Sequence, residues 1–228
     1  MFDFTALGAW FSDPENWAGR YGLWNLVAEH LTLTLLAIAL ASIVAVPIGV
    51  AIGHYGRGEF FVVGLGSFSR AIPTMGLLFA LVLATGVQLR ELSVVLALSA
   101  IALPPLLAGA YSGVTTIPAW IRDSATAQGM TTWQLVRHVE LPLAAASIIG
   151  GFRIAYIQVV STVVLAPLVG LGGVGFGIIQ GLALRNFPQV TASSLVIIMI
   201  TVAGDRVIGL VQRFAGARLG QSTPLEKS

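Results

Sequence analysis

Long apolar stretches dominate this chain, and short segments between them carry most of its charged and polar residues. A helix needs roughly 20 mainly apolar residues to cross a bilayer, because lipid cannot satisfy an unpaired backbone amide. Five stretches meet this requirement, and we predict spanning helices at about Leu31–Ile52, Phe60–Thr85, Leu92–Tyr111, Leu143–Val169 and Thr191–Phe214. The pattern therefore predicts an all-α membrane protein with five transmembrane helices.

The basic residues predict how these helices are oriented. With the N-terminus outside, the cytoplasmic set is Arg57, Arg122, Arg137, Arg213, Arg218 and Lys227. The outer set is then Arg20, Arg90 and Arg185. Cytoplasmic segments of membrane proteins are enriched in Lys and Arg. Six against three predicts an N-terminus outside and a C-terminus in the cytoplasm.

The two ends of the chain are expected to flank one helical core, residues 29–214. Residues 1–28 are predicted to lie on the outer surface, with a short helix that Ser12 or Asp13 caps before Pro14. This segment also supplies an interfacial aromatic belt of Trp10, Trp17, Tyr21 and Trp24. Residues 215–228 are expected to form a cytoplasmic tail. No internal repeat is evident, so residues 1–228 are interpreted as a single transmembrane domain.

Composition supports an integral membrane protein. Hydrophobic residues make up 56% of the 228 residues and charged residues only 10%, whereas soluble domains carry about 25% charged residues. The net charge is +2 and the basic residues are scattered, so no nucleic-acid partner is expected. The chain has no cysteine, which excludes disulfides and thiolate metal ligands, and no metal-ligand spacing is present. The first residues lack the positive charge of a cleaved signal peptide.

The segment 117–142, between the third and fourth predicted spans, is unusually polar. Pro118 suits the first turn of a short helix, and Gly129 suits its C-terminal end. Thr131 then stands as the N-cap of a second helix, with Gln134 completing a capping box. Pro142 is expected to end the second helix before the fourth span. Local signals thus predict a cytoplasmic helix-turn-helix.

One face of this helix-turn-helix is expected to be apolar. Met130 and Leu135 occupy the positions of a hydrophobic staple, and Met130, Trp133 and Val136 recur at helical spacing. Such a stripe suits docking on a partner. An ordered connector between two spans is the alternative.

This segment resembles the EAA loop of permease subunits in binding-protein-dependent ABC importers, whose pattern is E-A-A, three residues, G, nine residues, I-x-L-P. The matching residues are Asp123, Ser124 and Ala125 at E-A-A, Gly129 at the glycine, and Val139, Leu141 and Pro142 at I-x-L-P. Asp for Glu and Ser for Ala depart from the pattern. The resemblance implies the type I ABC importer permease fold, in which this loop couples to an ATPase, here through Met130 and Trp133.

The same resemblance implies several partners. These are two cytoplasmic ABC ATPase subunits, a second permease copy, identical or homologous, and an extracellular substrate-binding protein. No G-x-x-x-x-G-K-[ST] occurs in the chain, so ATP and Mg are expected on the ATPase and no cofactor on this chain. The chain itself is then a permease subunit and not an enzyme.

The resemblance extends over about Leu31–Phe214 and is similar to the osmoprotectant branch, whose solutes are glycine betaine, choline and carnitine. The stretches that carry it are "EHLTLTLLAIALASIVAVPIGVAIGHYGRG", "SRAIPTMGLLFAL" and "VVSTVVLAPLVGLGGVGFGIIQGL". Permeases for methionine and other amino acids share the second stretch more loosely. Transport of an amino acid is therefore the alternative.

The last of these stretches contains "GLGGVG", which fits the letters of a dinucleotide-binding fingerprint. It follows a predicted membrane span and not a strand, and the next acidic residue is Asp205, so that interpretation is rejected. Glycine permits positive φ and close helix approach. Gly170, Gly172, Gly173 and Gly175 are therefore candidates for an outer gate.

Some charged residues fall inside predicted spans, and Arg70, Arg153 and Asp205 lie deepest from the cytoplasmic side. At 1.5 Å per residue, Arg70, Arg153 and Asp205 would each lie roughly 15 Å from the cytoplasmic end of their span. Charges at such depth pair with one another or line water-filled cavities. We predict that Asp205 pairs with Arg153 or Arg70. Snorkelling to the interface is the alternative, and the histidines His30, His54 and His138 are expected at interfaces.

Two other classes of function are compatible with part of the pattern. A secondary carrier would use Asp205 as a proton site, although neither a second buried acid nor an inverted repeat is evident. An anchoring protein would bind a cytoplasmic partner without moving a solute. Dependence of uptake on ATP or on a proton gradient separates these classes.

Overall fold

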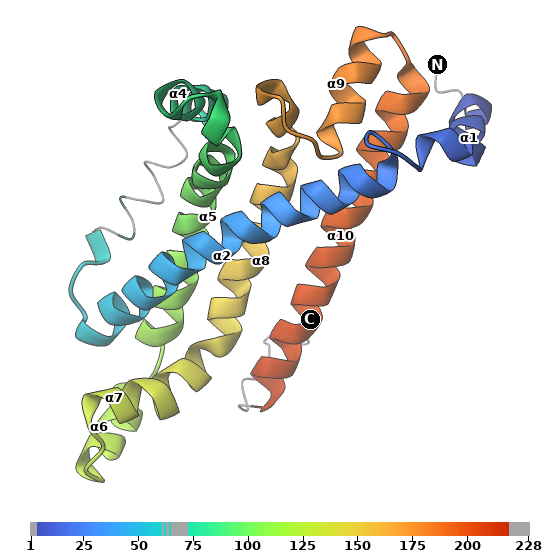
Figure 1. Ribbon diagram of the computed structural model, residues 1–228. Helices are drawn as coiled ribbons and strands as arrows, with labels where there is room; N and C mark the ends of the chain where they lie inside the picture. The colour runs from blue at the N-terminus through green and yellow to red at the C-terminus, as the bar shows by residue number, and fades with distance from the viewer. Residues whose placement is uncertain (1–3, 61, 63, 65–72, 219–228) are drawn as a thin grey trace. The chain divides into compact units, whose positions relative to one another are not determined.

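Every regular element that the structure describes is helical (Figure 1). The computed structural model describes residues 4–60, 62, 64 and 73–218. Its α-helices are α1 (Phe4–Ser12), α2 (Leu23–Tyr55), α4 (Thr74–Thr85), α5 (Arg90–Thr115), α6 (Ala119–Ala127), α7 (Thr132–Leu135), α8 (Leu141–Val163), α9 (Gly175–Ala183) and α10 (Phe187–Arg218). Shorter helical turns are η1 (Pro14–Asn16), η2 (Val87–Leu89), η3 (Val136–Glu140) and η4 (Ala166–Val169). The predicted all-α class is confirmed.

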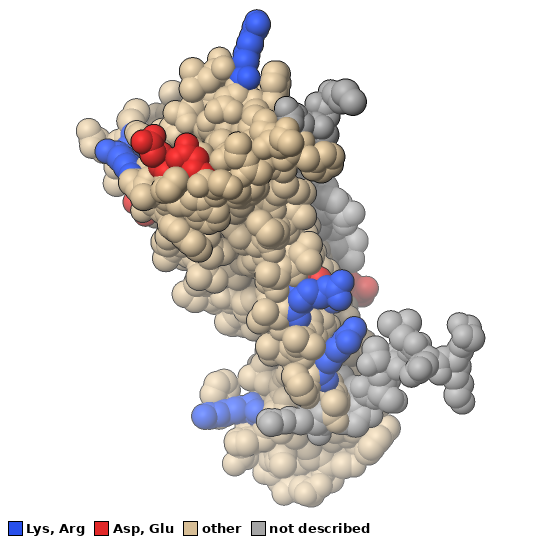
Figure 2. Space-filling model, turned by 90° about the vertical axis from the view of Figure 1, so that its right-hand side faces the viewer, with Lys and Arg blue, Asp and Glu red and all other residues tan. Residues whose placement is uncertain are grey.

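Four helical stretches of the described residues are long and apolar enough to cross a membrane. They are Leu23–Tyr55, Val87–Thr115, Thr132–Val163 and Phe187–Ala217, and they correspond to the first, third, fourth and fifth predicted spans. The second predicted span, Phe60–Thr85, lies partly outside the described residues, and α4 is its described C-terminal part. Most of the surface drawn in Figure 2 carries no charged residue. Five helices and the orientation of the termini stay predictions.

The N-terminal segment folds differently from the prediction at one point, because α2 begins at Leu23 and not at Leu31. The predicted surface segment therefore includes the first turns of a long helix. Of the two predicted caps, Asp13 is the one used: its carboxylate accepts the Glu15 backbone N–H at 3.0 Å at the start of η1. Ser12 instead ends α1, where its hydroxyl donates to the Gly8 carbonyl.

Two other predicted helix ends are wrong, each for a local reason. α8 ends at Val163 and not at Val169. Pro167 has no N–H to donate to the Val163 carbonyl, so the α-helical pattern cannot continue through it. α10 begins at Phe187 and not at Thr191, because the Asn186 side chain accepts the Gln189 backbone N–H at 3.2 Å and caps the helix earlier.

The described chain divides into two compact units. Unit 1 comprises Met1–Ala39, Ile72–Ile101 and Tyr156–Gly204. Within it, His30 is fully buried and its Nε2 lies 3.0 Å from the Val160 carbonyl oxygen. The hydroxyl of Ser99 donates to the Ala37 carbonyl at 3.0 Å. These bonds place polar groups inside the unit without leaving the bonded atoms unsatisfied.

Unit 2 comprises Leu40–Ala71, Ala102–Ala155 and Asp205–Ser228. Small residues let its helices approach closely. A Cβ on Gly109 of α5 would lie 2.8 Å from the Gly151 Cα of α8, and one on Gly49 of α2 would lie 2.7 Å from the Leu107 carbonyl oxygen. The adjoining core contains Val50, Ala110, Val114 and Ala144. The polar segment 117–142 belongs to this unit and is positioned by it.

Candidate functional site

Residues 117–142, which we call the coupling segment after the role predicted for them, begin with a helix close to the predicted one. Pro118 is the N-cap residue of α6, and the helix ends at Ala127. Gly129 follows with a φ of +85°, a value that L side chains rarely adopt. The predicted stop signal at Gly129 is confirmed.

The second helix of the coupling segment starts with the predicted capping box. The backbone N–H of Thr131 donates to Gln134 Oε1 at 2.8 Å, and the backbone N–H of Gln134 donates to the Thr131 hydroxyl. Leu135, at the predicted staple position, is buried. α7 is thereby fixed at its N-terminus by local bonds alone.

The predicted helix end at Pro142 is wrong. α7 continues through the π-helical turn η3 directly into α8, and Pro142 is the second residue of α8. A proline ring normally clashes with the carbonyl four residues earlier and removes a backbone bond. The π turn η3, in which the Leu141 N–H donates to the Val136 carbonyl, comes directly before Pro142. Because a π turn is wider than an α-helical turn, it gives the proline ring room at the place where the clash would arise.

The residues of the EAA pattern differ in exposure. Asp123, Ser124 and Gly129 are exposed, Ala125 is buried, and Met130, Val139, Leu141 and Pro142 are half-buried. The predicted stripe of Met130, Trp133 and Val136 is not one exposed face, because Val136 packs against the core of unit 2. The indoles of Trp133 and Trp120 are instead exposed, at 66% and 68%. Trp120, which sequence reasoning missed, was detectable as a large aromatic residue within a polar segment.

A mostly apolar groove of about 540 Å³ runs beside Trp133. One wall comes from α2 and the other from the coupling segment. Its lining residues are Val46, Pro47, Val50, Ala51, His54, Tyr55, Thr132, Trp133, Val136 and Leu141. The coupling segment is therefore in direct packing with the end of a long apolar helix.

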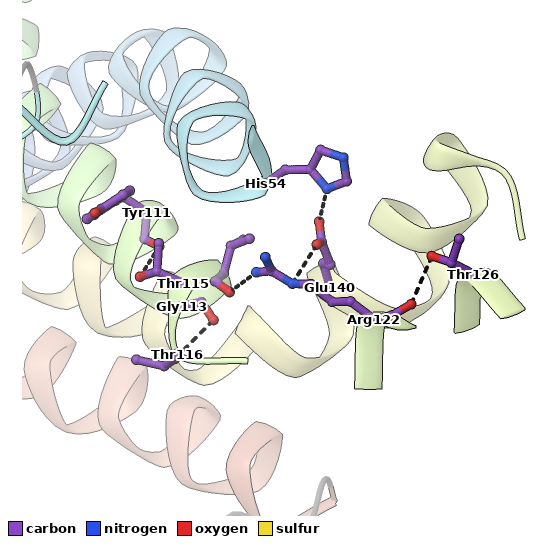
Figure 3. A network of polar contacts seen from close by, with 9 residues as sticks. His54, Tyr111, Gly113, Thr115, Thr116, Arg122, Thr126 and Glu140 are labelled. Atoms are coloured by element: carbon purple, nitrogen blue, oxygen red, sulfur yellow. Dashed lines mark hydrogen bonds and ion pairs between the residues drawn. The ribbon is translucent and has the colours of Figure 1, made fainter. Parts of the chain in front are cut away.

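His54 of this groove contacts a buried carboxylate, that of Glu140 in η3 (Figure 3). The Glu140 side chain is completely buried, with Oε2 2.9 Å from His54 Nδ1 and Oε1 3.1 Å from Arg122 Nε. Nη2 of Arg122 also donates to the Val114 carbonyl. His54 is thus paired and His30 is buried in unit 1, whereas their predicted location at a membrane interface stays a prediction. Sequence reasoning missed this cluster.

Inside unit 2, Arg153 of α8 and Asp205 of α10 form the predicted ion pair. Nε donates to Oδ1 at 2.5 Å and Nη2 to Oδ2 at 2.8 Å, a bidentate arrangement. Arg206, Gly209, Leu210 and Arg213 complete a polar pocket of about 470 Å³ around the pair. Arg70, the other predicted partner, lies outside the described residues.

The four candidate gate glycines lie in unit 1, three of them between α8 and α9 and Gly175 at the start of α9. Gly170 and Gly173 have φ values of +80° and +97°. The Gly173 N–H donates to Glu29 Oε2 at 3.1 Å, and the same carboxylate leaves no room for a Cβ on Gly172. Gly175, the first residue of α9, has no room either, because a backbone carbonyl lies against it. Close approach and positive φ are as expected, whereas gating stays a prediction.

The described residues contain no cluster of three or more His, Asp or Glu side chains placed to hold a metal ion. The features that the described residues do present are the exposed indoles of Trp120 and Trp133 and the ion pairs of Glu140 and Asp205.

The sequence matches the family described as "Binding-protein-dependent transport system inner membrane component" over residues 37–221. This chain belongs to that family and is a multi-pass membrane protein. Among curated relatives, it is 28% identical to the carnitine transport permease protein OpuCD of Listeria monocytogenes over 201 residues, 88% of this chain and 89% of that protein. It is 30% identical to the glycine betaine/carnitine/choline transport system permease protein OpuCB of Bacillus subtilis, covering 81% and 84%.

Another relative is the osmoprotectant import permease protein OsmW of Salmonella typhimurium, which is 29% identical over 82% of this chain and 89% of that protein. Among solved structures, the inward-facing MetNI methionine ABC transporter matches with a TM-score of 0.73 and 21% identity. The match covers 85% of this chain and 95% of that one. This likeness establishes the permease fold.

Proposed function

We propose that this chain is the membrane-spanning subunit of an ATP-driven importer that moves quaternary ammonium osmoprotectants by alternating access. The observation that carries the proposal is the coupling segment, a capped helix-turn-helix with the EAA pattern and two exposed indoles. Apolar aromatic side chains exposed at a docking face are typical anchors of protein interfaces. The curated relatives supply the solute class, which comprises glycine betaine, carnitine and choline.

The importer requires further subunits. Two ATPase subunits would dock at the coupling segment and bind ATP and Mg. A second permease copy, identical or homologous, would complete the pathway, and an extracellular binding protein would deliver the solute. Closure of the ATPases would then shift the permease between inward-open and outward-open states.

Methionine or another amino acid is the second candidate solute. It is supported by the structural likeness to the methionine transporter, although at 21% identity that likeness concerns the fold. Uptake of labelled glycine betaine, carnitine, choline and methionine into proteoliposomes that contain the permease, its ATPase and its binding protein separates the candidates. ATP-dependent uptake of methionine alone would reject the osmoprotectant assignment. Uptake that follows a proton gradient without ATP would reject the importer.

Trp133→Ala tests the docking face in the same assembly. Truncation of a buried aromatic anchor costs 2 kcal/mol or more, so ATPase binding should weaken by roughly 30-fold. Trp24→Ala is the matched control, because Trp24 is 68% exposed and lies in unit 1. Binding of the labelled ATPase to permease in nanodiscs measures both variants. Equal binding by Trp133→Ala and wild type would show that the ATPase docks elsewhere.

A further inference from the structure

Glu140 joins four segments of unit 2 through one buried carboxylate. Its own backbone lies in η3, the continuation of α7. His54 at the C-terminal end of α2 contacts one carboxylate oxygen, and Arg122 of α6 contacts the other. Arg122 extends the connection to α5 through the Val114 carbonyl (Figure 3). We refer to Glu140, Arg122 and His54 as the clasp.

The clasp is costly to open. The Glu140 side chain has no exposed surface, while the side chains of Arg122 and His54 are 24% and 14% exposed. A buried charge without its partner is strongly destabilising. Movement of α6 or η3 away from α2 would separate the carboxylate from the Arg122 guanidinium or the His54 imidazole inside the protein. The coupling helices and the ends of α2 and α5 are therefore expected to move as one body.

We propose that Glu140 is a positioning residue for energy coupling: through Arg122 and His54, it locks the coupling segment to α2 and α5. Movement of a docked ATPase would then displace α2 and α5 together with the coupling segment, instead of only bending the segment. The inference rests on the proposed function, since it assigns to one buried side chain the transmission that an ATP-driven importer needs.

A role in stability alone makes a different prediction. Buried ion pairs replaced by apolar residues of similar volume are often equally stable or more stable. Apolar contacts are not directional, however, and do not fix the position of α6 and η3 relative to α2 as the charged and hydrogen-bonded contacts of Glu140 do. A Glu140→Leu, Arg122→Met, His54→Leu triple variant should therefore fold and hydrolyse ATP while it transports poorly.

The test is the number of solute molecules imported per ATP hydrolysed, measured in proteoliposomes with equal amounts of assembled complex. Glu140→Gln should lower this ratio by roughly tenfold, within the range typical of coupling between sites, while ATPase binding stays at the wild-type level. Glu15→Gln, at an exposed position in unit 1, is the control and should leave the ratio unchanged. A merely structural defect would lower assembly, hydrolysis and uptake together and leave the ratio intact.

His54→Gln provides a second test if Glu140→Gln does not assemble. This substitution changes only the His54 contact of the Glu140 carboxylate and keeps the contact with Arg122. The complex should therefore form, and the number of solute molecules imported per ATP should fall less than in Glu140→Gln. An unchanged ratio in Glu140→Gln, or in His54→Gln where the former does not assemble, would overturn the inference. So would normal transport by the triple variant. Absence of ATP-dependent uptake in the wild type would instead overturn the proposed function.

Discussion

Substitution of Gly129 by alanine should weaken ATPase binding through backbone strain alone. Gly129 has a φ of +85°, and a Cβ built on it would meet no other atom within 4 Å. Steric crowding with neighbours therefore contributes nothing, and the penalty is that of a left-handed conformation, roughly 1–2 kcal/mol for an L residue. The free variant should relax into another turn, which ATPase binding must reverse. Affinity should then fall by roughly 5- to 30-fold.

Two matched variants isolate this effect. Asparagine tolerates positive φ better than alanine, so Gly129→Asn should retain more affinity than Gly129→Ala. Gly56 has a φ of +64° and an equally open surrounding, but it lies outside the coupling segment. Gly56→Ala should carry similar strain and leave ATPase binding unchanged.

The assay is titration of each permease variant in nanodiscs with a fluorescently labelled ATPase, with the melting temperature of each variant recorded in parallel. Equal losses for Gly129→Ala and Gly129→Asn would show that φ is not the cause. An equal loss for Gly56→Ala would show that the effect is a general destabilisation and not a property of the docking turn.

Two further predictions concern packing inside unit 2. Gly109→Ala places a Cβ 2.8 Å from the Gly151 Cα and should destabilise the protein by about 1–3 kcal/mol through overpacking. Gly76→Ala, whose Cβ would have its nearest neighbour at 3.6 Å, is the control and should be neutral or stabilising. A lower melting temperature for Gly109→Ala alone would confirm this prediction, and equal shifts for both variants would contradict it. A double-mutant cycle of Arg153→Met and Asp205→Ala should give a coupling free energy of about 1 kcal/mol. The value is expected to be small because the Arg153 side chain is 42% exposed. If the melting-temperature changes of the two single variants simply add in the double variant, the ion pair contributes nothing to stability.

Features set by local sequence were predictable. The capping box at Thr131 and Gln134 and the stop at Gly129 depend only on residues a few positions apart, which the sequence displays directly. The Arg153–Asp205 pair was predictable from depth, because the constant rise of a helix converts residue number into distance. For the ion pair this rule left Arg153 and Arg70 as alternative partners of Asp205, and the structure shows Arg153.

Features that join distant segments were not predictable in the same way. His54 and Glu140 are 86 residues apart, and neither residue stands in a pattern that indicates the other. The helix through Pro142 was missed because the usual effect of proline holds for a regular α-helix and not for one that widens into a π turn. The start of α10 at Phe187 could have been predicted from Asn186, a common N-cap residue three positions before Gln189. It was missed because the predicted span was placed by hydropathy alone.

The uninterrupted path of α7 through η3 into α8 has a consequence for engineering. A loop tethered by flexible ends can be exchanged between homologous proteins as a cassette, but this coupling segment shares its helical axis with the protein that carries it. If residues 117–142 alone were moved into a host without a histidine at the position of His54, the buried Glu140 carboxylate would lose one of its two partners. A graft into such a host would need a histidine at the position of His54 as a companion change, so the transferable unit includes the end of α2 as well as residues 117–142.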